Sequence, residues 1–138
     1  MGELCFQNIR CLVRTPKDFD PNKKYPVLLF LHGAGTRGDD ISKLSGSAFY
    51  QITGAYEDFP FITVAPLCGE NSWFDIFEKL KLFVKDILAL PYADADRLYL
   101  MGTSMGGYGT WQLAMSMPSA LRRSFLFAAA VCTGMRDG

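Results

Sequence analysis

The sequence has 138 residues, of which 49% are hydrophobic, and its 14 basic and 14 acidic side chains give a formal net charge of zero. This length and composition suit one globular domain over residues 1–138 with its own core. A balanced charge gives no electrostatic reason to expect a nucleic acid or an anionic membrane as a partner. No apolar run reaches the roughly 18 residues of a membrane span, and no secretory leader begins the chain. We therefore expect a cytoplasmic protein.

The cysteines do not indicate a metal site. Cys5, Cys11, Cys68 and Cys132 are scattered along the chain and lack the C-x-x-C spacing of zinc-binding loops. Scattered cysteines in a cytosolic protein are typically buried and reduced. We therefore predict reduced thiols and no zinc site.

The first half of the chain alternates between strand and loop patterns. We predict a strand over about 6–14, an unbroken apolar strand over Val27–Leu31, a weak helix over about 41–51 and a strand over Phe61–Ala65. The two unbroken apolar runs are typical of strands that are buried on both faces. The segment after Leu31 is the glycine-containing loop His32–Gly35.

The clearest helix is predicted over Trp73–Leu90. Ser72 and Asp75 have the spacing of a capping box, and Pro91 ends the helix. Apolar side chains recur at three- and four-residue spacing, which places them on one face against a sheet. These are Trp73, Phe74, Phe77, Leu80, Val84, Ile87 and Leu88.

The second half predicts a strand over 97–101, a helix over 105–117 and a final apolar strand over 125–132. Strands that alternate with long helices indicate an α/β fold, with a mostly parallel sheet and helices on both faces. In such sheets the reactive groups lie at the carboxyl ends of the strands.

A Gly-x-Ser-x-Gly motif occupies residues 102–106, between a predicted strand and a predicted helix. A serine at such a turn is the nucleophile elbow of α/β-hydrolases, in which Ser104 would be the nucleophile. Gly102 and Gly106 flank it because the two backbone arms of the turn nearly touch. The motif by itself is weak, but its place between strand and helix makes it specific.

The His32–Gly35 loop is the second part of the candidate site. In α/β-hydrolases a glycine-rich loop after an early strand gives one N–H of the oxyanion hole, and the residue after the nucleophile gives the other. Here the donors would be the backbone N–H groups of Met105 and of Ala34, with Gly35 as the alternative to Ala34. His32 and Gly33 would shape the loop.

These segments resemble the N-terminal part of α/β-hydrolases of the carboxylesterase and dienelactone-hydrolase-like group, which includes proteins labelled "predicted peptidase". The resemblance rests on residues 25–40, on Ala65-Pro66 with Trp73 nearby, on residues 96–108 and on residues 127–131. It covers nearly the whole chain. It implies hydrolysis of carboxylic esters, with a small-molecule ester as substrate and without a metal or an organic cofactor.

The chain departs from this pattern after Ser104. Hydrolases of this fold place the acid and then the histidine after the serine. The 34 residues that follow Ser104 contain no histidine and one acidic residue, Asp137. We therefore expect a truncated α/β-hydrolase fold that lacks its last strands. His32 is the sole histidine, and the favoured interpretation is that it hydrogen-bonds to the backbone of the oxyanion loop rather than acting as the base.

Several residues keep two interpretations. Arg37 would bind a substrate carboxylate or pair with an aspartate to pin its loop. Tyr108, Trp111 and Leu113 would line a substrate pocket or pack in the core. The glycines at 106, 107 and 109 are expected to permit close helix–strand packing. A dinucleotide loop is disfavoured because G-x-G-x-x-G is not met.

Two functions from different classes therefore remain. One is a serine esterase whose acid and base lie outside this chain. The other is a catalytically silent fragment that acts as an interaction or oligomerisation module. Because a strand over 125–132 would present an open apolar edge, we also expect self-association through this region.

Overall fold

The computed structural model of the protein describes residues 2–33, 36–46, 50, 61–70, 72–103, 105–116 and 125–130. The strands are β1 (Gly2–Phe6), β2 (Ile9–Arg14), β3 (Tyr25–Leu31), β4 (Ile62–Pro66), β5 (Ala93–Thr103) and β6 (Phe125–Ala130). The helical elements are α1 (Ser42–Ser45), the 3₁₀ turn η2 (Trp73–Ile76), α3 (Phe77–Leu88) and α4 (Met105–Ser116).

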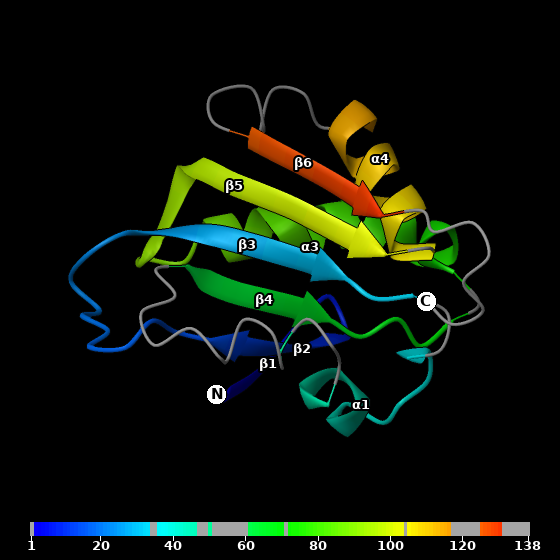
Figure 1. The fold of residues 1–138 in the computed structure, drawn as a ribbon, viewed down its shortest axis with the longest axis horizontal. Coiled ribbons are helices and arrows are strands. Elements are labelled where there is room, and N and C mark those ends of the chain that lie inside the picture. Colours follow the sequence, from blue (N-terminus) through cyan, green and yellow to red (C-terminus); the bar gives the residue numbers. More distant parts are fainter. Residues whose placement is uncertain are drawn as a thin grey trace.

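The strands of these described segments form one six-stranded sheet in the order β1-β2-β4-β3-β5-β6 (Figure 1). The four strands β4, β3, β5 and β6 run parallel to one another, as the alternating pattern predicts. The strands β1 and β2 are antiparallel to their neighbours, so the sheet as a whole is mixed.

The N-terminal segment corrects one expectation, because it is a hairpin and not a single strand over 6–14. Gln7 and Asn8 have φ values of 56° and 60°, and Phe6 faces Ile9 across the turn. Two successive residues with positive φ match the right-handed twist of the paired strands. The sequence signal for this turn is weak, because Asn8 lacks the glycine that usually follows an asparagine in such a turn.

Alternation along the strands divides the core into two layers. In β3, Val27, Leu29 and Leu31 belong to the larger core cluster, whereas Phe30 belongs to the smaller one. Since successive side chains of a strand point to opposite faces, the two clusters cover opposite faces of the sheet. The larger cluster includes α3, which lies behind the sheet in Figure 1, and the smaller one includes Leu44 of α1. Helical elements therefore cover both faces, as expected.

The helix predicted over Trp73–Leu90 begins as the 3₁₀ turn η2 and continues as α3. The predicted capping box is confirmed: the Ser72 side chain accepts from the Phe74 N–H at 3.2 Å, and the Asp75 carboxylate accepts from the Ser72 N–H at 3.2 Å. Most of the predicted apolar face is buried, but Phe74 is 50% exposed. Phe83, which was not predicted to belong to this face, is fully buried. The 3₁₀ turn changes the angular spacing at the start of the helix, which the α-helical period did not anticipate.

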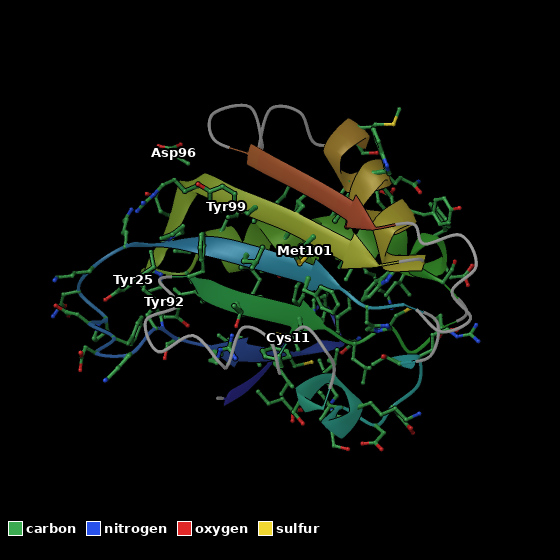
Figure 2. The ribbon with its side chains drawn as sticks, viewed as in Figure 1. Cys11, Tyr25, Tyr92, Asp96, Tyr99 and Met101 are labelled. Carbon is green, nitrogen blue, oxygen red and sulfur yellow. The ribbon has the colours of Figure 1, made fainter. Side chains whose placement is uncertain are left out.

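Figure 2 distinguishes the two ends of the parallel strands. At the amino end of β3 and β5, Tyr25 and Tyr92 lie side by side, and the Tyr25 N–H donates to the Tyr92 carbonyl at 2.9 Å (Figure 2). Met101 lies toward the opposite, carboxyl end of β5 (Figure 2). This carboxyl end is where the sequence predicts the reactive groups.

Some expectations lie partly or wholly outside the described residues. The weak helix predicted over 41–51 is described as α1 with a further helical residue at Tyr50, and 47–49 and 51 are outside. The final strand is described over Phe125–Ala130, and 131–132 are outside. Ala34, Gly35, Ser104 and Cys132 are also outside. Cys11 and Cys68 are free and buried as expected, whereas Cys5 is free but exposed.

Candidate active site

Adjacent parallel strands bring the two candidate loops to one edge of the sheet. Leu31, the last residue of β3, lies opposite Gly102 of β5 in the strand register. The start of the His32 loop and the end of β5 therefore lie at nearly the same level of the sheet. β5 ends at Thr103 and α4 begins at Met105, so the predicted strand and helix lie on either side of Ser104, which is itself outside the described residues.

The glycines on either side of Ser104 lie where no side chain fits. A Cβ added at Gly106 would stand 2.7 Å from the His32 carbonyl oxygen and closer still to the Leu31 carbonyl. A Cβ added at Gly102 would stand 2.5 Å from Thr110 Oγ1 and closer still to the Gly106 carbonyl. The first turn of α4 therefore lies directly against the end of β3 and the end of β5. The contact of Gly102 with the Gly106 carbonyl is the close approach of the two arms that was predicted, and the contacts of Gly106 with β3 agree with the predicted helix–strand packing.

The rest of α4 keeps this contact through small and buried residues. A Cβ added at Gly109 would stand 3.0 Å from Trp73 Cβ and 3.1 Å from Leu31 Cδ1, which confirms the predicted packing role of this glycine. Thr110 is fully buried and donates its hydroxyl hydrogen to the Gly106 carbonyl at 2.8 Å. Leu113 is buried in the core, which settles its two interpretations in favour of packing.

His32 is buried, with 1% of its surface exposed, and both nitrogens of its ring are bonded to the backbone. Nδ1 lies 2.6 Å from the Gly33 carbonyl, and Nε2 lies 2.9 Å from the Cys68 N–H. A carbonyl only accepts and an N–H only donates, so Nδ1 carries the proton and Nε2 is the acceptor. Hydrogen bonds from His32 to the backbone were predicted from the sequence, and both ring nitrogens make them.

Burial lowers the pKa of His32 to about 4, although the bond to the Gly33 carbonyl acts in the opposite direction. The imidazole is therefore neutral at physiological pH. Its basic lone pair is already used by the Cys68 N–H. A general base must reach the hydroxyl proton that it removes, so His32 is poorly suited to activate a serine.

The loop that begins at His32 is held at both ends by one residue of the next loop. The Cys68 N–H binds the His32 ring, and the Cys68 carbonyl accepts from the Gly38 N–H at 3.0 Å. Within the loop, the Thr36 N–H donates to the Gly33 carbonyl at 3.3 Å. Gly38 has a φ of 127°, a conformation that favours glycine.

Two residues that the sequence analysis did not assign to the site support this loop. Cys68 does so through its backbone, and no side-chain pattern reveals such a role. Trp73 donates its indole N–H to the His32 carbonyl at 3.0 Å, and its ring centroid lies 4.9 Å from that of His32. The sequence placed Trp73 in the core, where it is fully buried, but gave no sign of a bond to the loop.

The two candidate substrate-binding residues, Arg37 and Tyr108, are both exposed. Tyr108 is 52% exposed on α4, and Trp111, one turn further along α4, is 51% exposed. Beside Arg37, the Asp39 carbonyl accepts from Arg10 at 3.1 Å, and the Asp40 carboxylate accepts from the Ser42 N–H at 3.1 Å. A role for Arg37 or Tyr108 in substrate binding stays a prediction.

No cluster of three or more His, Cys, Asp or Glu side chains in the described residues is arranged to hold a metal ion. None of the helices in the same residues combines the length and apolar character needed to cross a bilayer.

Proteins with similar sequences carry the names of hydrolases. A protein of Schizosaccharomyces pombe that carries the name dipeptidyl aminopeptidase is 30% identical to this chain, in an alignment that covers 79% of this chain and 16% of the relative. A protein of Ajellomyces capsulatus named dipeptidyl-aminopeptidase B is 29% identical to this chain, in an alignment that covers 72% of this chain and 12% of the relative. No family model matches the chain. According to these coverages, the chain spans less than a fifth of the length of both relatives.

Solved structures show the same fold. A thermostable esterase superposes with a TM-score of 0.64 at 30% identity, over 87% of this chain and 38% of the esterase. A feruloyl esterase module from Clostridium thermocellum superposes with a TM-score of 0.65 at 17% identity, over 87% of this chain and 50% of the module. With the strand order, these likenesses show that the chain spans part of the α/β-hydrolase fold, and the two proteins that are 30% identical to it show that it belongs to the α/β-hydrolase superfamily.

Proposed function

We propose that this chain carries the nucleophile and the oxyanion hole of a serine hydrolase that cleaves carboxylic esters. Ser104 is the nucleophile, and the backbone N–H groups of Met105 and of Ala34 or Gly35 hold the oxyanion. The carboxylesterase and dienelactone-hydrolase-like group is the part of the superfamily that the motifs resemble. The esterase that is 30% identical to this chain supports an ester as substrate.

The observation that carries the proposal is the contact of Gly106 with the carbonyls of Leu31 and His32. It brings the first turn of α4 against the start of the loop that holds the other proposed donor. The unpaired N–H groups of a helix's first turn favour developing negative charge. Two donors that meet one oxygen at about 3 Å from different elements require such an approach.

The proposed chemistry forms a bond between the Ser104 hydroxyl oxygen and the ester carbonyl carbon, and the alkoxy group leaves. The hydroxyl proton must pass to a base and then to the leaving alcohol. His32, the one histidine of the sequence, is bonded to the backbone through both nitrogens. We therefore place the triad base and acid outside these 138 residues.

A fluorophosphonate tests the nucleophile directly. In its reaction the Ser104 oxygen forms a bond to phosphorus, fluoride leaves and the hydroxyl proton goes to the buffer. Intact-mass and peptide mass spectrometry should find one phosphonyl group, on Ser104, after long incubation. Ser104→Ala should remain unlabelled. The matched control is Ser116→Ala, at the opposite end of α4, which should label like the wild type. Labelling elsewhere, or of Ser104→Ala, would overturn the proposal.

A second candidate function is an interaction or oligomerisation module. Tyr108, Trp111 and Met115 recur on α4 at three- and four-residue spacing and are 52%, 51% and 74% exposed. The helix carries no charged residue in its 12 positions. Exposed apolar stripes of this kind mark contact surfaces. A chain that self-associates through this stripe and β6 but never labels at Ser104 would favour this candidate.

A further inference from the structure

We propose that Trp73 is a positioning residue for catalysis, because it fixes the start of the loop that holds one proposed oxyanion donor. The inference rests on the proposed function, since it assigns Trp73 to the same site. Trp73 belongs to η2, which lies between β4 and α3 in the chain and far from Ser104 in the sequence.

The indole N–H fixes the His32 carbonyl. It donates to this oxygen at 3.0 Å, and both residues are buried, with 0% and 1% of their surfaces exposed. A buried carbonyl that loses its donor is left without compensation from water. The bond therefore sets the orientation of the peptide plane between His32 and Gly33, from which the loop begins.

The Trp73 side chain contacts both the loop and α4. One side of the contact is the His32 ring, with a centroid distance of 4.9 Å. On another side, Gly109 of α4 approaches so closely that an added Cβ would be 3.0 Å from Trp73 Cβ. The proposed donors belong to this loop and to the first residue of α4. Trp73 thus contacts both elements whose relative position defines the oxyanion hole.

The ring of His32 is held by a residue other than Trp73. Its Nε2 accepts from the Cys68 N–H at 2.9 Å, and Cys68 also holds Gly38 through its carbonyl. The ring and the carbonyl of His32 are therefore tied to two different residues. Replacing Trp73 by phenylalanine removes the donor to the carbonyl and leaves the ring bond and the backbone bonds of Cys68 in place.

Positioning matters because oxyanion stabilisation depends on geometry. Misplacement of a catalytic group by about 1 Å can cost roughly 10²-fold in rate. Trp73 does not act on the substrate through its N–H, because the His32 carbonyl already uses that hydrogen. Its effect is expected to pass through the loop.

Amide hydrogen exchange tests the structural half of the inference. In the wild type, the Trp73 indole N–H should be strongly protected. In Trp73→Phe, exchange at Thr36 and Gly38 should accelerate about 10-fold, as expected for the loss of one buried hydrogen bond. The matched control is Ile87→Val, because Ile87 is a buried core residue in the last turn of α3 and its replacement lowers stability without removing a hydrogen-bond donor. An unprotected indole, or unchanged exchange at Thr36 and Gly38, would overturn the inference.

The rate of phosphonylation of Ser104 tests the functional half. We expect Trp73→Phe to react about 10-fold more slowly than the wild type, because the phosphonyl oxygen occupies the oxyanion hole. Ile87→Val should react at the wild-type rate. Faster loop exchange with an unchanged labelling rate would show that Trp73 is only structural and would overturn the inference. No labelling of Ser104 in any variant would overturn the proposed function, and the exchange rates would still decide whether Trp73 holds the loop.

Discussion

The Nε2 atom of His32 accepts a hydrogen bond from the backbone N–H of Cys68 at 2.9 Å. This bond joins the loop after β3 to the loop after β4, and it exists only while Nε2 is unprotonated. The charge of one buried imidazole is thereby coupled to the arrangement of two loops at the carboxyl end of the sheet. The pH dependence of folding stability follows from this coupling, and the effect of replacing Gly106 follows from the glycine contacts beside it.

Folding stability should fall as the pH drops from about 6.5 to about 4. Burial lowers the pKa of His32 from 6.5 to about 4 in the folded state, so the unfolded state binds the proton more tightly. The contribution is therefore fully present above about pH 6.5 and is lost toward pH 4, by about 3 kcal/mol in total. Urea unfolding at a series of pH values measures this loss.

The matched variant for this measurement is His32→Gln, whose stability should vary little across the same pH range. Hydrogen bonds from Ser42 and Arg97 lower the pKa values of the Asp40 and Asp94 carboxyls, so those groups titrate below the window. Since the sequence has one histidine, the window is free of other imidazoles. An equal slope in wild type and His32→Gln would contradict the prediction.

Gly106→Ala should destabilise the fold by about 1–3 kcal/mol or more, as overpacking does. The added methyl group would overlap the carbonyls of Leu31 and His32, which are backbone atoms at the end of β3 and cannot rotate away. Thermal and urea unfolding measure the change. Gly46→Ala is the control, because its added Cβ would meet nothing nearer than the Ser42 carbonyl at 3.9 Å. Equal effects of the two substitutions would refute the close approach.

This chain alone should hydrolyse p-nitrophenyl acetate very slowly. Serine hydrolases without their triad retain roughly 10³–10⁴-fold acceleration over water from the oxyanion hole and binding. Without a base, Ser104 adds little to this, so Ser104→Ala should retain the residual rate within about threefold. His32→Ala should lower it only as far as it loosens the loop. Protein freed of host esterases is essential for the measurement.

A turnover of about 1–10³ s⁻¹, typical of enzymes, that Ser104→Ala abolishes would contradict this expectation. If His32→Ala also abolished such a turnover in a folded protein, His32 would have to act as the base. Its bonds to Gly33 and Cys68 make us expect otherwise.

The chain should self-associate at tens of micromolar. In the described part of the chain, β6 has a strand partner on its β5 side, and α4 packs beside β6 with Met115 74% exposed. Light scattering should therefore detect dimers or larger species. Met115→Lys should shift the population toward monomer by placing a charge in the apolar stripe.

Leu82→Lys is the control for association, because Leu82 is 46% exposed on α3, a different helix from the one that carries the stripe. It should leave the association unchanged. A purely monomeric wild type with an ordered β6 would rule out the predicted contact. Equal effects of the two lysine substitutions would place it elsewhere.

The parts of the fold that follow from local pattern were predictable from the sequence. The apolar run at 27–31, the capping box at Ser72 and the helix after Gly102 have strong periodic or capping signals, and the structure confirms all three. The Gln7–Asn8 turn was not predicted, because the run from Phe6 to Arg14 reads equally well as one strand. Whether such a run forms one strand or a hairpin depends on the strands that it pairs with, and the local sequence pattern does not show which strands these are.

The candidate site was predictable only where its residues carry a motif. Glycines at 102 and 106 were identified from their spacing around Ser104. The support from Cys68 comes from its backbone, which any residue other than proline supplies. The bond from Trp73 depends on the depth at which η2 packs, and the sequence places Trp73 no differently from any other core aromatic.

The capping box at Ser72 starts the helix one residue before Trp73, and Cys68 lies four residues upstream. Each residue added to or removed from the segment between Cys68 and Trp73 would shift the 3₁₀ turn by one position, which is a rotation of about 120°, or would break its cap. Phe74, now 50% exposed, or Ser72 would then point at His32. Length variation among relatives should therefore be rare in this short connection and frequent between β2 and β3, where residues 15–24 form exposed turns.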